Sequence, residues 1–379
     1  MKILLFSNTD WFMFNFNLPL ANRLRQEGHQ IILLSPPGVY AAKMQDLGFR
    51  WVAAPMGRGS LNIFREVALI IWLVKFFLRE HIDLIHSFTI KCVVYGSLAA
   101  RIARIPARIN TVAGMGYVFA SSHIKAKVLR PMVEILMHVS LGGKHSRLIV
   151  LNHSDFNFFR NTRIVDQNSI YLVPGAGIDC QKFSPSNKIR RRSLFTVLLP
   201  ARLLWDKGVA EYVESARILK VGGNDYDFLL AGSLDPENPS AVTELKINEW
   251  TKQGLVRWLG HIDDMPALFQ SVDVVVLPSY REGLPTGLTE AGACALPLIT
   301  TDVPGCNEVV TNEIDGLLVP IKNPKSIADA LSRLKDDPAL CYRLGRAARA
   351  KAVSQFDNKI VIQRTLDVYK GLIEKLPNK

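Results

Sequence analysis

The stretch VDVVVLPSYREGLPTGLTEAGACALPLITTDVPGCNEVV, residues 272–310, carries the pattern of a buried strand, a loop, a helix and a second strand. The first strand, expected over Val272 to Leu277, ends in four apolar residues, as in a strand that a parallel sheet buries on both faces. Pro285 suits the first position of a helix over Pro285 to Cys294, and a second strand is expected over Pro297 to Thr300. The helix N-terminus therefore follows a strand's carboxyl end, where free N–H groups and the helix dipole favour an anion.

The same alternation of strand and helix patterns runs through the rest of the chain. In the first half, we expect strands over Ile3 to Phe6, Gln30 to Leu34, Trp51 to Ala54, Leu84 to His86, Ala107 to Thr111 and Leu148 to Leu151. In the second half, we expect them over Phe195 to Leu199, Phe228 to Ala231 and Val256 to Leu259. Strands separated by helices form parallel sheets, so the pattern predicts two doubly wound α/β domains that face each other across a cleft.

The domain boundary is expected in residues 174–193, PGAGIDCQKFSPSNKIRRRS, which are rich in Gly, Pro and Arg and have no apolar periodicity. We place the first domain over residues 1–180 and the second over residues 181–357. A chain of 379 residues is long enough for two such domains, at ~150 residues each.

Composition places the chain among ordinary globular proteins, with 48% apolar and 21% charged residues. The longest apolar stretch, Val67 to Leu78, contains Lys75 and is far shorter than the ~20 residues that cross a bilayer, so no transmembrane helix is expected. The N-terminal MKILLFSN has no small-residue cleavage site and is expected to be a first strand. Five scattered cysteines without a C-x-x-C motif fit a reducing compartment, and we expect a cytoplasmic protein.

Charge is unevenly distributed along the chain, whose net charge is +12. Residues 1–180 hold 20 Lys and Arg against 10 Asp and Glu, whereas residues 181–379 hold 26 against 24. The basic first half suits an anionic membrane surface or a phosphorylated acceptor. Nucleic acid is the weakest candidate partner, because no basic run is interleaved with stacking aromatic residues.

Two pairs of charged residues are the candidates for chemistry. Glu282 follows the strand that ends at Leu277, and Glu290 could direct its carboxylate toward the same crevice from the helix. An ordinary loop acid and a solvated helix residue explain these two equally well. Arg202 and Lys207 follow the strand that ends at Leu199. The planar guanidinium of an arginine and the compact ammonium of a lysine are the groups expected around a diphosphate. Taken alone, surface cations that cap carbonyl groups are the better explanation for that second pair.

Together these residues resemble the retaining glycosyltransferases of family 4, which have the GT-B fold. Glu282 and Glu290 stand with seven residues between them, and Arg202 and Lys207-Gly208 precede them. The resemblance continues in TDVPGCNEVV (301–310), DGLLVP (315–320), HSFTIKCVVYGSLAA (86–100) and NTVAGMGYVF (110–119), and so covers nearly the whole chain. The motifs resemble the branch that builds capsule, O-antigen and bacterial N-glycan precursors on a polyprenyl diphosphate.

The resemblance implies a role for each candidate in the second domain. Arg202 and Lys207 would hold the diphosphate of a nucleotide-sugar, and Glu290 would accept hydrogen bonds from the ribose hydroxyls. Glu282 would contact the donor sugar, helped by the backbone N–H groups of Gly283 and Leu284. The loop at His261-Ile262 would meet the base through its backbone. Retention is explained in this family by front-face attack, in which the leaving phosphate draws the acceptor's proton and cations stabilise the departing diphosphate.

The first domain departs from the family pattern at two loops. Many members have a Gly-Gly loop after the first strand, where this chain has SNTDWFMFNFN (7–17), and a histidine where Ala113 and Gly114 stand. Which group of the first domain touches the donor sugar is therefore open, with Gly114 as one candidate. Asn15 and His86 are the candidates for the acceptor, although a hydrogen-bonded core histidine explains His86 equally well.

Three further signals bear on partners. Asp225-Tyr226-Asp227 matches a metal-binding D-x-D, but it precedes a buried strand instead of ending one, so we expect a solvated turn, no metal and no cofactor. The segment Ile124 to Val139 carries Lys125, Lys127 and Arg130 beside Val128, Leu129, Val133, Leu136 and Met137. Such a basic amphipathic segment can lie on an anionic membrane, the alternative being an ordinary helix with a solvated face. The aromatic residues of the 7–17 loop could meet a lipid or an acceptor sugar, or simply pack beneath the first helix.

The sequence thus predicts a cytoplasmic, metal-independent, retaining glycosyltransferase, held peripherally on the inner face of the cell membrane. It would transfer a sugar, an N-acetylhexosamine being our choice, from a UDP-sugar donor to a lipid-diphosphate-linked sugar acceptor. A final helix in residues 358–379 is expected to pack on the first domain, as in other GT-B proteins. The alternatives are a GT-B epimerase or phosphorylase without a lipid acceptor, or an inactive scaffold. A nicotinamide oxidoreductase is disfavoured because no G-x-G-x-x-G follows the first strand.

Overall fold

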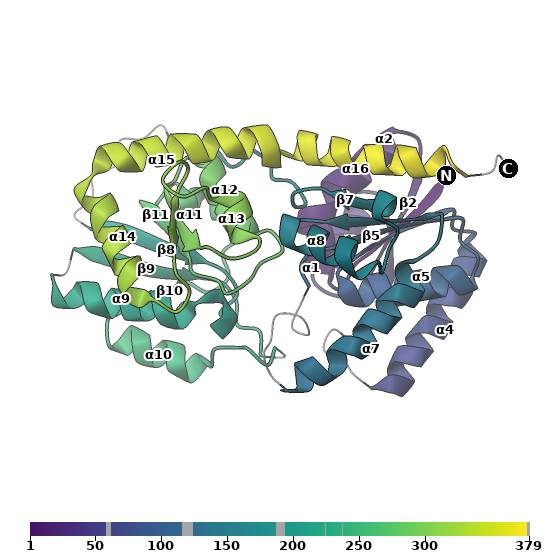
Figure 1. Ribbon diagram of the computed structural model, residues 1–379, viewed down its shortest axis with the longest axis horizontal. Helices are drawn as coiled ribbons and strands as arrows, with labels where there is room; N and C mark the ends of the chain where they lie inside the picture. Colours follow the sequence, from purple (N-terminus) through teal and green to yellow (C-terminus); the bar gives the residue numbers. More distant parts are fainter. Residues whose placement is uncertain (58–61, 116–123, 187–193, 224, 237, 377–379) are drawn as a thin grey trace. The chain divides into compact units, whose positions relative to one another are not determined.

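The computed structural model describes residues 1–57, 62–115, 124–186, 194–223, 225–236 and 238–376, and of residues 124–129 only the backbone. The chain forms two compact units. Unit 1 comprises Met1–Gly177 and Asn358–Lys379, and unit 2 comprises Ile178–Asp357. The first crossing between the units therefore lies just before the predicted boundary at residue 180. In each unit, helices surround one parallel sheet (Figure 1).

Unit 1 is built on a seven-stranded sheet with the order β3-β2-β1-β4-β5-β6-β7. Its strands are β1 (Lys2–Phe6), β2 (Gln30–Ser35), β3 (Arg50–Ala53), β4 (Leu84–Phe88), β5 (Ala107–Val112), β6 (Ser146–Val150) and β7 (Ile170–Leu172). All of the pairings are parallel, with Leu4 of β1 opposite Ile32 of β2 and Ile85 of β4. The six strands predicted in this half are confirmed.

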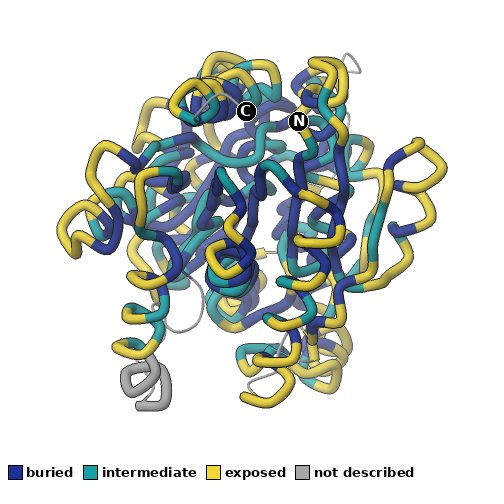
Figure 2. The backbone as a smooth tube through the Cα atoms, turned by 90° about the vertical axis from the view of Figure 1, so that its right-hand side faces the viewer, coloured by how far each residue is buried: buried dark blue, intermediate teal, exposed yellow. Residues whose placement is uncertain are grey.

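Helices cover both faces of this sheet because alternate residues of each strand point to opposite faces. They are α1 (Asp10–Phe12), α2 (Leu18–Gln26), α3 (Tyr40–Asp46), α4 (Ile63–Glu80), α5 (Ile90–Ile102), α7 (Ile124–Leu141), α8 (His153–Thr162) and α16 (Asn358–Ile373). Ile3 and Leu5 of β1 share a core with α2 and α16, whereas Leu4 and Phe6 share one with α4 and α5. In Figure 2 the strands lie in the buried interior and the exposed residues lie on the outer turns. The predicted final helix belongs to unit 1.

The segment 7–17, expected to be a loop, is largely helical. Helix α1 continues into a π-helical turn, η1 (Met13–Asn17), and the side chain of Thr9 caps α1 by accepting a hydrogen bond from the backbone N–H of Phe12. Phe12 and Phe14 pack against the core beneath α2, which favours the packing alternative for them. Trp11 stays exposed.

Unit 2 is built on a six-stranded parallel sheet with the order β10-β9-β8-β11-β12-β13. Its strands are β8 (Phe195–Pro200), β9 (Tyr226–Ala231), β10 (Arg257–Trp258), β11 (Val274–Leu277), β12 (Leu298–Thr301) and β13 (Leu317–Val319). Its helices are α9 (Val209–Val221), α10 (Glu244–Lys252), α11 (Met265–Phe269), α12 (Thr286–Ala293), α13 (Cys306–Val309), α14 (Pro324–Asp336) and α15 (Pro338–Lys351). Short helical turns complete the chain: η2 (Gln167–Ser169), η3 (Trp205–Lys207) and η4 (Ala352–Phe356).

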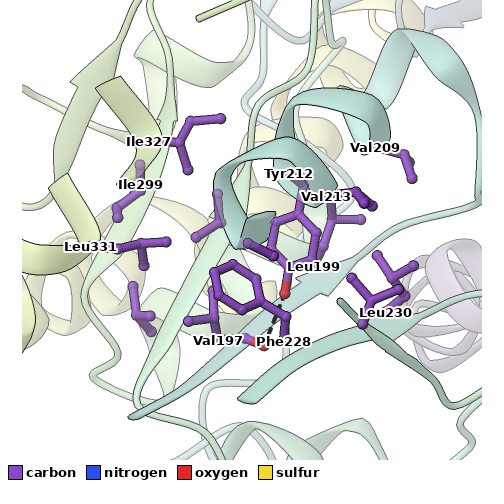
Figure 3. Close-up of a cluster of buried hydrophobic side chains, with 14 of the residues drawn as sticks. Val197, Leu199, Val209, Tyr212, Val213, Phe228, Leu230, Ile299, Ile327 and Leu331 are labelled. Atoms are coloured by element: carbon purple, nitrogen blue, oxygen red, sulfur yellow. Dashed lines mark hydrogen bonds between the residues drawn. The ribbon is translucent and has the colours of Figure 1, made fainter. Parts of the chain in front are cut away.

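Tyr212 fixes helix α9 against the centre of this sheet (Figure 3). Its side chain is fully buried among apolar residues of the sheet. Its hydroxyl lies 2.9 Å from the carbonyl oxygens of both Val197 and Leu229, on neighbouring strands. A buried hydroxyl needs such a partner, so the contact satisfies the phenol and sets the position of the helix that follows β8.

No helix in the described part of the chain is long and apolar enough to span a bilayer. Helix α7 runs through Pro131 without a break. Proline has no backbone N–H, so one hydrogen bond of the helix interior is missing at this position.

His86 lies in the core of unit 1, where it joins the final helix to the sheet. Only 1% of the residue is exposed. Its Nδ1 lies 2.9 Å from the hydroxyl of Tyr369 on α16, and its Nε2 lies 2.7 Å from the hydroxyl of Thr111 on β5. Burial lowers the pKa of His86 to about 3, so the ring is neutral at physiological pH. His86 is thus a hydrogen-bonded core histidine, and its prediction as an acceptor contact is wrong.

Replacing Tyr369 by Phe should destabilise the protein by about 1–3 kcal/mol, because a buried ring nitrogen of His86 then loses its partner. Thermal unfolding followed by circular dichroism measures the change. Tyr342→Phe is the matched control, since this tyrosine of α15 is exposed and should shift stability by less than about 0.5 kcal/mol. Equal melting temperatures for Tyr369→Phe and wild type would contradict this account of His86.

Candidate functional site

The candidate site lies at the carboxyl ends of β8 and β11, the two central strands of unit 2. These strands are neighbours, and the chain proceeds from β8 toward one edge of the sheet and from β11 toward the other. Loops that diverge at such a switch point leave a crevice between them, where open α/β sheets bind ligands. Arg202 and Lys207 follow β8, and Glu282 follows β11. The sheet order therefore brings the two predicted pairs of residues together at the carboxyl ends of the strands.

Glycines allow these loops to approach one another closely. Gly208 has a φ of +72°, and a Cβ there would lie 2.1 Å from the carbonyl oxygen of Pro278. A Cβ on Gly287 would lie 2.8 Å from the carbonyl oxygen of Pro200. Only glycine fits both positions without a shift of the backbone. The Lys207-Gly208 pair therefore has a packing reason, and the first turn of α12 lies against the end of β8.

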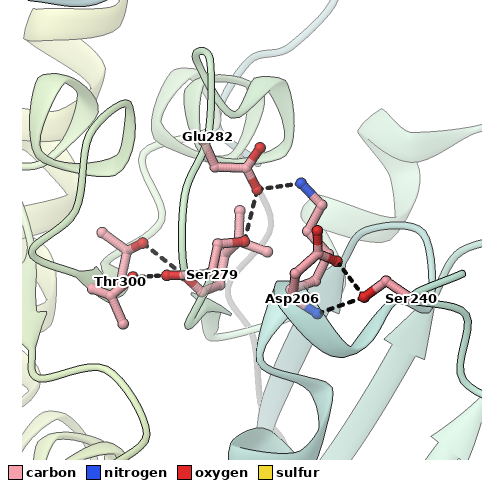
Figure 4. Close-up of polar contacts among 8 residues, drawn as sticks. Asp206, Ser240, Ser279, Glu282 and Thr300 are labelled. Carbon is pink, nitrogen blue, oxygen red and sulfur yellow. Dashed lines mark hydrogen bonds and ion pairs between the residues drawn. The ribbon is translucent and has the colours of Figure 1, made fainter. Parts of the chain in front are cut away.

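An ion pair joins the two loops (Figure 4). The ammonium of Lys207 lies 2.5 Å from Oε1 of Glu282, with 15% and 12% of the two side chains exposed. The hydroxyl of Ser279 donates to the same carboxylate oxygen at 2.7 Å, and the hydroxyl of Thr301 donates to the carbonyl of Ser279. Because the pair is poorly hydrated and Ser279 is a second donor to the carboxylate, the side chains of Lys207 and Glu282 are held in one geometry. Glu282 thus pairs with Lys207, a contact that sequence analysis did not predict.

Backbone hydrogen bonds fix the loop that carries Glu282. The N–H of Tyr280 donates to the carbonyl of Asp206 at 2.9 Å, and the N–H of Glu282 donates to the carbonyl of Pro304 at 3.0 Å. Gly305, at φ +86°, approaches the backbone of Glu282 so closely that a Cβ would lie 2.5 Å from its carbonyl oxygen. Three separate loops are therefore tied together around this carboxylate.

Arg202 is also paired with a carboxylate. Its Nη1 lies 2.5 Å from Oδ2 of Asp235, which is nearly buried in the loop after β9. The arginine side chain itself is 46% exposed, so part of its guanidinium faces solvent. Asp235 and Ser279 were not among the predicted site residues. Both follow strands at the same edge of the sheet, and this position is the signal that could have identified them.

Glu290 lies in the second turn of α12, which begins at Thr286. Pro285 precedes the helix with an extended ψ of 104°, so its predicted place as the first helical residue is wrong by one position. Burial raises the pKa of the Glu290 carboxyl to about 8, against a smaller opposite effect of Lys182. No side chain of the described residues is hydrogen-bonded to this carboxyl. A half-buried carboxyl without a partner is suited to receive hydroxyl groups.

The remaining predicted residues of unit 2 surround these loops. Gly283 and Leu284 lie between Glu282 and the start of α12, with Leu284 packed against the core. His261 is exposed after β10, where its Nε2 lies 3.3 Å from Oδ1 of Asp263. Ile262 packs partly against the core. The carbonyl of Gly260 accepts a hydrogen bond from the N–H of Gly232 at 2.8 Å, so this loop joins the same edge of the sheet.

In unit 1, two of the predicted residues are accessible from solvent. Asn15 is exposed on η1, and its amide donates to the carbonyl of Trp11 at 2.9 Å. Gly114 stands at φ +95° just after the carboxyl end of β5 and is partly exposed. Residues 116–119 of the NTVAGMGYVF motif lie outside the described residues.

The D-x-D sequence lies at the opposite end of its strand from these loops. Asp225 pairs with Lys335 at 2.7 Å, and Asp227 forms two hydrogen bonds with Arg257 at 3.0 and 2.6 Å. Both carboxylates therefore have cationic partners. Strand β9 begins at Tyr226, so only Asp225 precedes the strand, and the motif lies at its amino end instead of wholly before it. Among the described residues, no cluster of His, Cys, Asp and Glu could hold a metal ion.

Two family models match the chain. "Glycosyl transferases group 1" matches residues 183–351, nearly all of unit 2, and "Glycosyl transferase 4-like" matches residues 2–141 of unit 1. HepE of Anabaena, solved as a complex with UDP, superposes with a TM-score of 0.78 at 19% identity, over 98% of this chain and 100% of that one. At this identity the likeness shows the fold alone, and the chain has the GT-B fold.

Two curated relatives are similar over most of their length. The chain is 33% identical to N,N'-diacetylbacillosaminyl-diphospho-undecaprenol alpha-1,3-N-acetylgalactosaminyltransferase of Campylobacter jejuni, over 99% of this chain and 100% of the relative. It is 28% identical to UDP-Gal:alpha-D-GlcNAc-diphosphoundecaprenol alpha-1,3-galactosyltransferase of Escherichia coli, over 83% of this chain and 82% of the relative.

Glu290 makes stability depend on pH. Between about pH 4.5 and 8, the folded protein holds a proton on this carboxyl that the unfolded chain has lost. The raised pKa therefore costs stability as pH rises through this window. Since the carboxyl keeps some contact with water, we expect wild type to lose about 1–2 kcal/mol relative to Glu290→Gln between pH 6 and 8. Urea unfolding at both values measures this difference, with the exposed Glu374→Gln as control. Wild type and Glu290→Gln losing equal stability over this interval would contradict the assignment.

Proposed function

The chain belongs to the group 1 glycosyltransferases, and we propose that it transfers a sugar from a UDP-sugar to a polyprenyl-diphosphate-linked saccharide, with retention of configuration. The ion pair between Lys207 and Glu282 at the switch point of unit 2 carries the proposal, because it holds a cation where the diphosphate would lie. The names of the two relatives support the acceptor class, since each acts on a sugar linked to undecaprenyl diphosphate.

Lys207 would stabilise the diphosphate as it departs. An ammonium has three N–H donors, and Glu282 and a phosphate oxygen can share them. Because Glu282, itself fixed by the Ser279 hydroxyl, already holds the ammonium in place, the ammonium needs little reorganisation when charge develops on the leaving group. Arg202 would supply a second cation, with Asp235 fixing one end of its guanidinium and leaving further N–H groups for phosphate oxygens.

The amides at the start of α12 would add to this positive field. Pro285 has no N–H, and the N–H of Leu288 donates to the carbonyl of Pro285, but Thr286 and Gly287 of the first turn have amides, and that turn lies against the end of β8. Glu290 would accept hydrogen bonds from the ribose hydroxyls, which suits its carboxyl without a partner. The loop at His261 and Ile262 would contact the base through its backbone.

The chemical step is a substitution on one face of the donor sugar. The bond between the anomeric carbon and the β-phosphate oxygen breaks, and a bond from an acceptor hydroxyl forms on the same face. The hydroxyl proton passes to the β-phosphate of the leaving UDP, so no protein nucleophile is required. Under this proposal the contribution of the protein is positioning and electrostatic stabilisation of the diphosphate. Glu282 would contact the donor sugar with the backbone of Gly283 and Leu284.

The donor is proposed to be a UDP-N-acetylhexosamine, because the relative aligned over the whole chain is named for N-acetylgalactosaminyl transfer. The acceptor's polyprenyl chain would bring the enzyme to the inner face of the cell membrane as a peripheral protein. Unit 1 would bind this acceptor, with Asn15 as a contact. Both relatives are named as transferases, and this favours transfer over the epimerase or phosphorylase alternative.

A panel assay tests the proposal. The purified chain is incubated with labelled UDP-sugars and polyprenyl-diphosphate-linked monosaccharides, with and without EDTA, and the products are identified by mass spectrometry and NMR. We expect one donor and acceptor pair to give an α-linked product at a rate that EDTA leaves unchanged. Absence of product from every pair would contradict the function. Loss of activity in EDTA, restored by a divalent ion, would contradict metal independence.

Lys207→Met should lower kcat by about 10²–10³, because it removes a preorganised donor from the leaving group. Arg202→Met should lower kcat at least tenfold, since that side chain is more exposed and is shared with Asp235. Steady-state kinetics with the productive pair measure both changes. Lys335→Met is the control, because this lysine pairs with Asp225 at the amino end of β9 and should leave kcat unchanged. If both site variants kept the wild-type kcat, the proposal that Lys207 and Arg202 stabilise the departing diphosphate would be contradicted.

A further inference from the structure

Lys207 has three acidic neighbours and pairs with only one of them. Asp206 precedes it in the chain, Glu211 follows it in the first turn of α9, and Glu282 faces it from the loop after β11. In the part of the chain that the structure describes, the ammonium forms an ion pair with Glu282 and with neither of the other two. An ammonium is attracted to any carboxylate that it can reach, so this choice of partner needs a structural reason.

A hydroxyl group donates to each of the carboxylates that Lys207 does not use. The hydroxyl of Ser240 lies 3.3 Å from Oδ1 of Asp206 (Figure 4). The phenol of Tyr280 lies 2.6 Å from Oε1 of Glu211, a length typical of a hydrogen bond to a charged carboxylate. Both acids are therefore occupied by neutral donors.

Tyr280 is fixed in place for its contact with Glu211. Its backbone N–H donates to the carbonyl of Asp206 at 2.9 Å, so the tyrosine is tied to the loop that carries Lys207. The ammonium of Lys322 lies 5.5 Å from the centre of its ring, on which a cation is attracted. Burial, together with the hydrogen bond to Glu211, raises the pKa of the phenol, so the hydroxyl keeps its proton and remains a donor.

Glu211 is the acid that would compete for Lys207 if the phenol were absent. Its second oxygen, Oε2, is buried and has no hydrogen-bond partner in the described structure. An acid at this position of a helix often accepts the N–H of the capping residue, but the N–H of Gly208 donates to the carbonyl of Trp205 instead. Without Tyr280 the carboxylate would be left with no partner, and Lys207, four residues away, is the cation nearest to it in the chain.

We propose that Tyr280 is a positioning residue, which holds Glu211 away from Lys207 and so reserves the ammonium for Glu282 and for the diphosphate. This inference rests on the proposed function, which gives Lys207 its role at the leaving group. Without the phenol, the ammonium would divide its time between Glu211 and Glu282. The preorganised donor would then be in place in only a fraction of the molecules.

A double-mutant cycle between Tyr280 and Glu211 tests the proposal, with steady-state kinetics on the productive donor and acceptor. Tyr280→Phe should lower kcat about tenfold, because it sets a competing carboxylate free. Glu211→Gln should keep kcat within about twofold of wild type, since the amide still accepts from the phenol and carries no charge. The double variant should recover to within about threefold of wild type, because no second carboxylate is left to draw the ammonium away.

The double variant separates positioning from a merely structural role. If the phenol only stabilised the loop, the loss of both partners would be no better than the loss of one. Tyr226→Phe is the matched control and should leave kcat unchanged. Tyr226 is also half-buried in unit 2, with the ammonium of Lys335 4.8 Å from its ring centre, but it lies at the amino end of β9. Melting temperatures of all variants show whether each one is folded.

A crystal structure of Tyr280→Phe locates the ammonium without reference to activity. We expect an ion pair between Lys207 and Glu211 in at least part of the molecules. Lys207 paired with Glu282 alone in this variant would overturn the inference. So would a wild-type kcat in Tyr280→Phe, or a double variant as slow as Tyr280→Phe. If wild type gave no product with any donor and acceptor, the proposed function would fall, and the crystal structure would still decide whether Tyr280 selects the partner of Lys207.

Discussion

The ion pair between Lys207 and Glu282 is the interaction on which the candidate site depends. It joins the loops that follow β8 and β11, the two neighbouring strands at which the chain changes direction across the sheet. Because both side chains are nearly out of contact with water, removing either one leaves a charge that is poorly solvated. Each side chain therefore keeps the other in place. An anionic ligand can then accept a hydrogen bond from the Lys207 ammonium without a further loss of entropy in the lysine side chain.

Close backbone contacts make this geometry possible, and they explain why the acidic and basic residues lie where they do. Gly208 and Gly287 bring the start of α9 and the start of α12 against the strand ends. Charge is unevenly divided between the units. Unit 2 is nearly neutral, and each of its two candidate cations is paired with a carboxylate, Lys207 with Glu282 and Arg202 with Asp235. Unit 1 carries most of the net positive charge.

Sequence alone predicted most strands and helices, because apolar periodicity reports directly on burial. It also identified Lys207 and Glu282, since both follow strands that end at one edge of a sheet. It could not predict that they pair, because 75 residues separate them and loop geometry decides the contact. The prediction that His86 contacts the acceptor failed because a histidine at the end of a strand can point into the core as readily as out of it. Which side of α7 is covered could not be predicted either, because an apolar residue in the sequence does not show whether it faces the core, as Val133, Leu136 and Met137 do.

The position of UDP in a crystal structure of the complex is the most direct measure of the central claim. The account predicts the β-phosphate oxygens within hydrogen-bonding distance of the Lys207 ammonium and the Arg202 guanidinium, with the ribose hydroxyls at Glu290. A nucleotide bound elsewhere on the chain, or one whose phosphates contact neither cation, would contradict it.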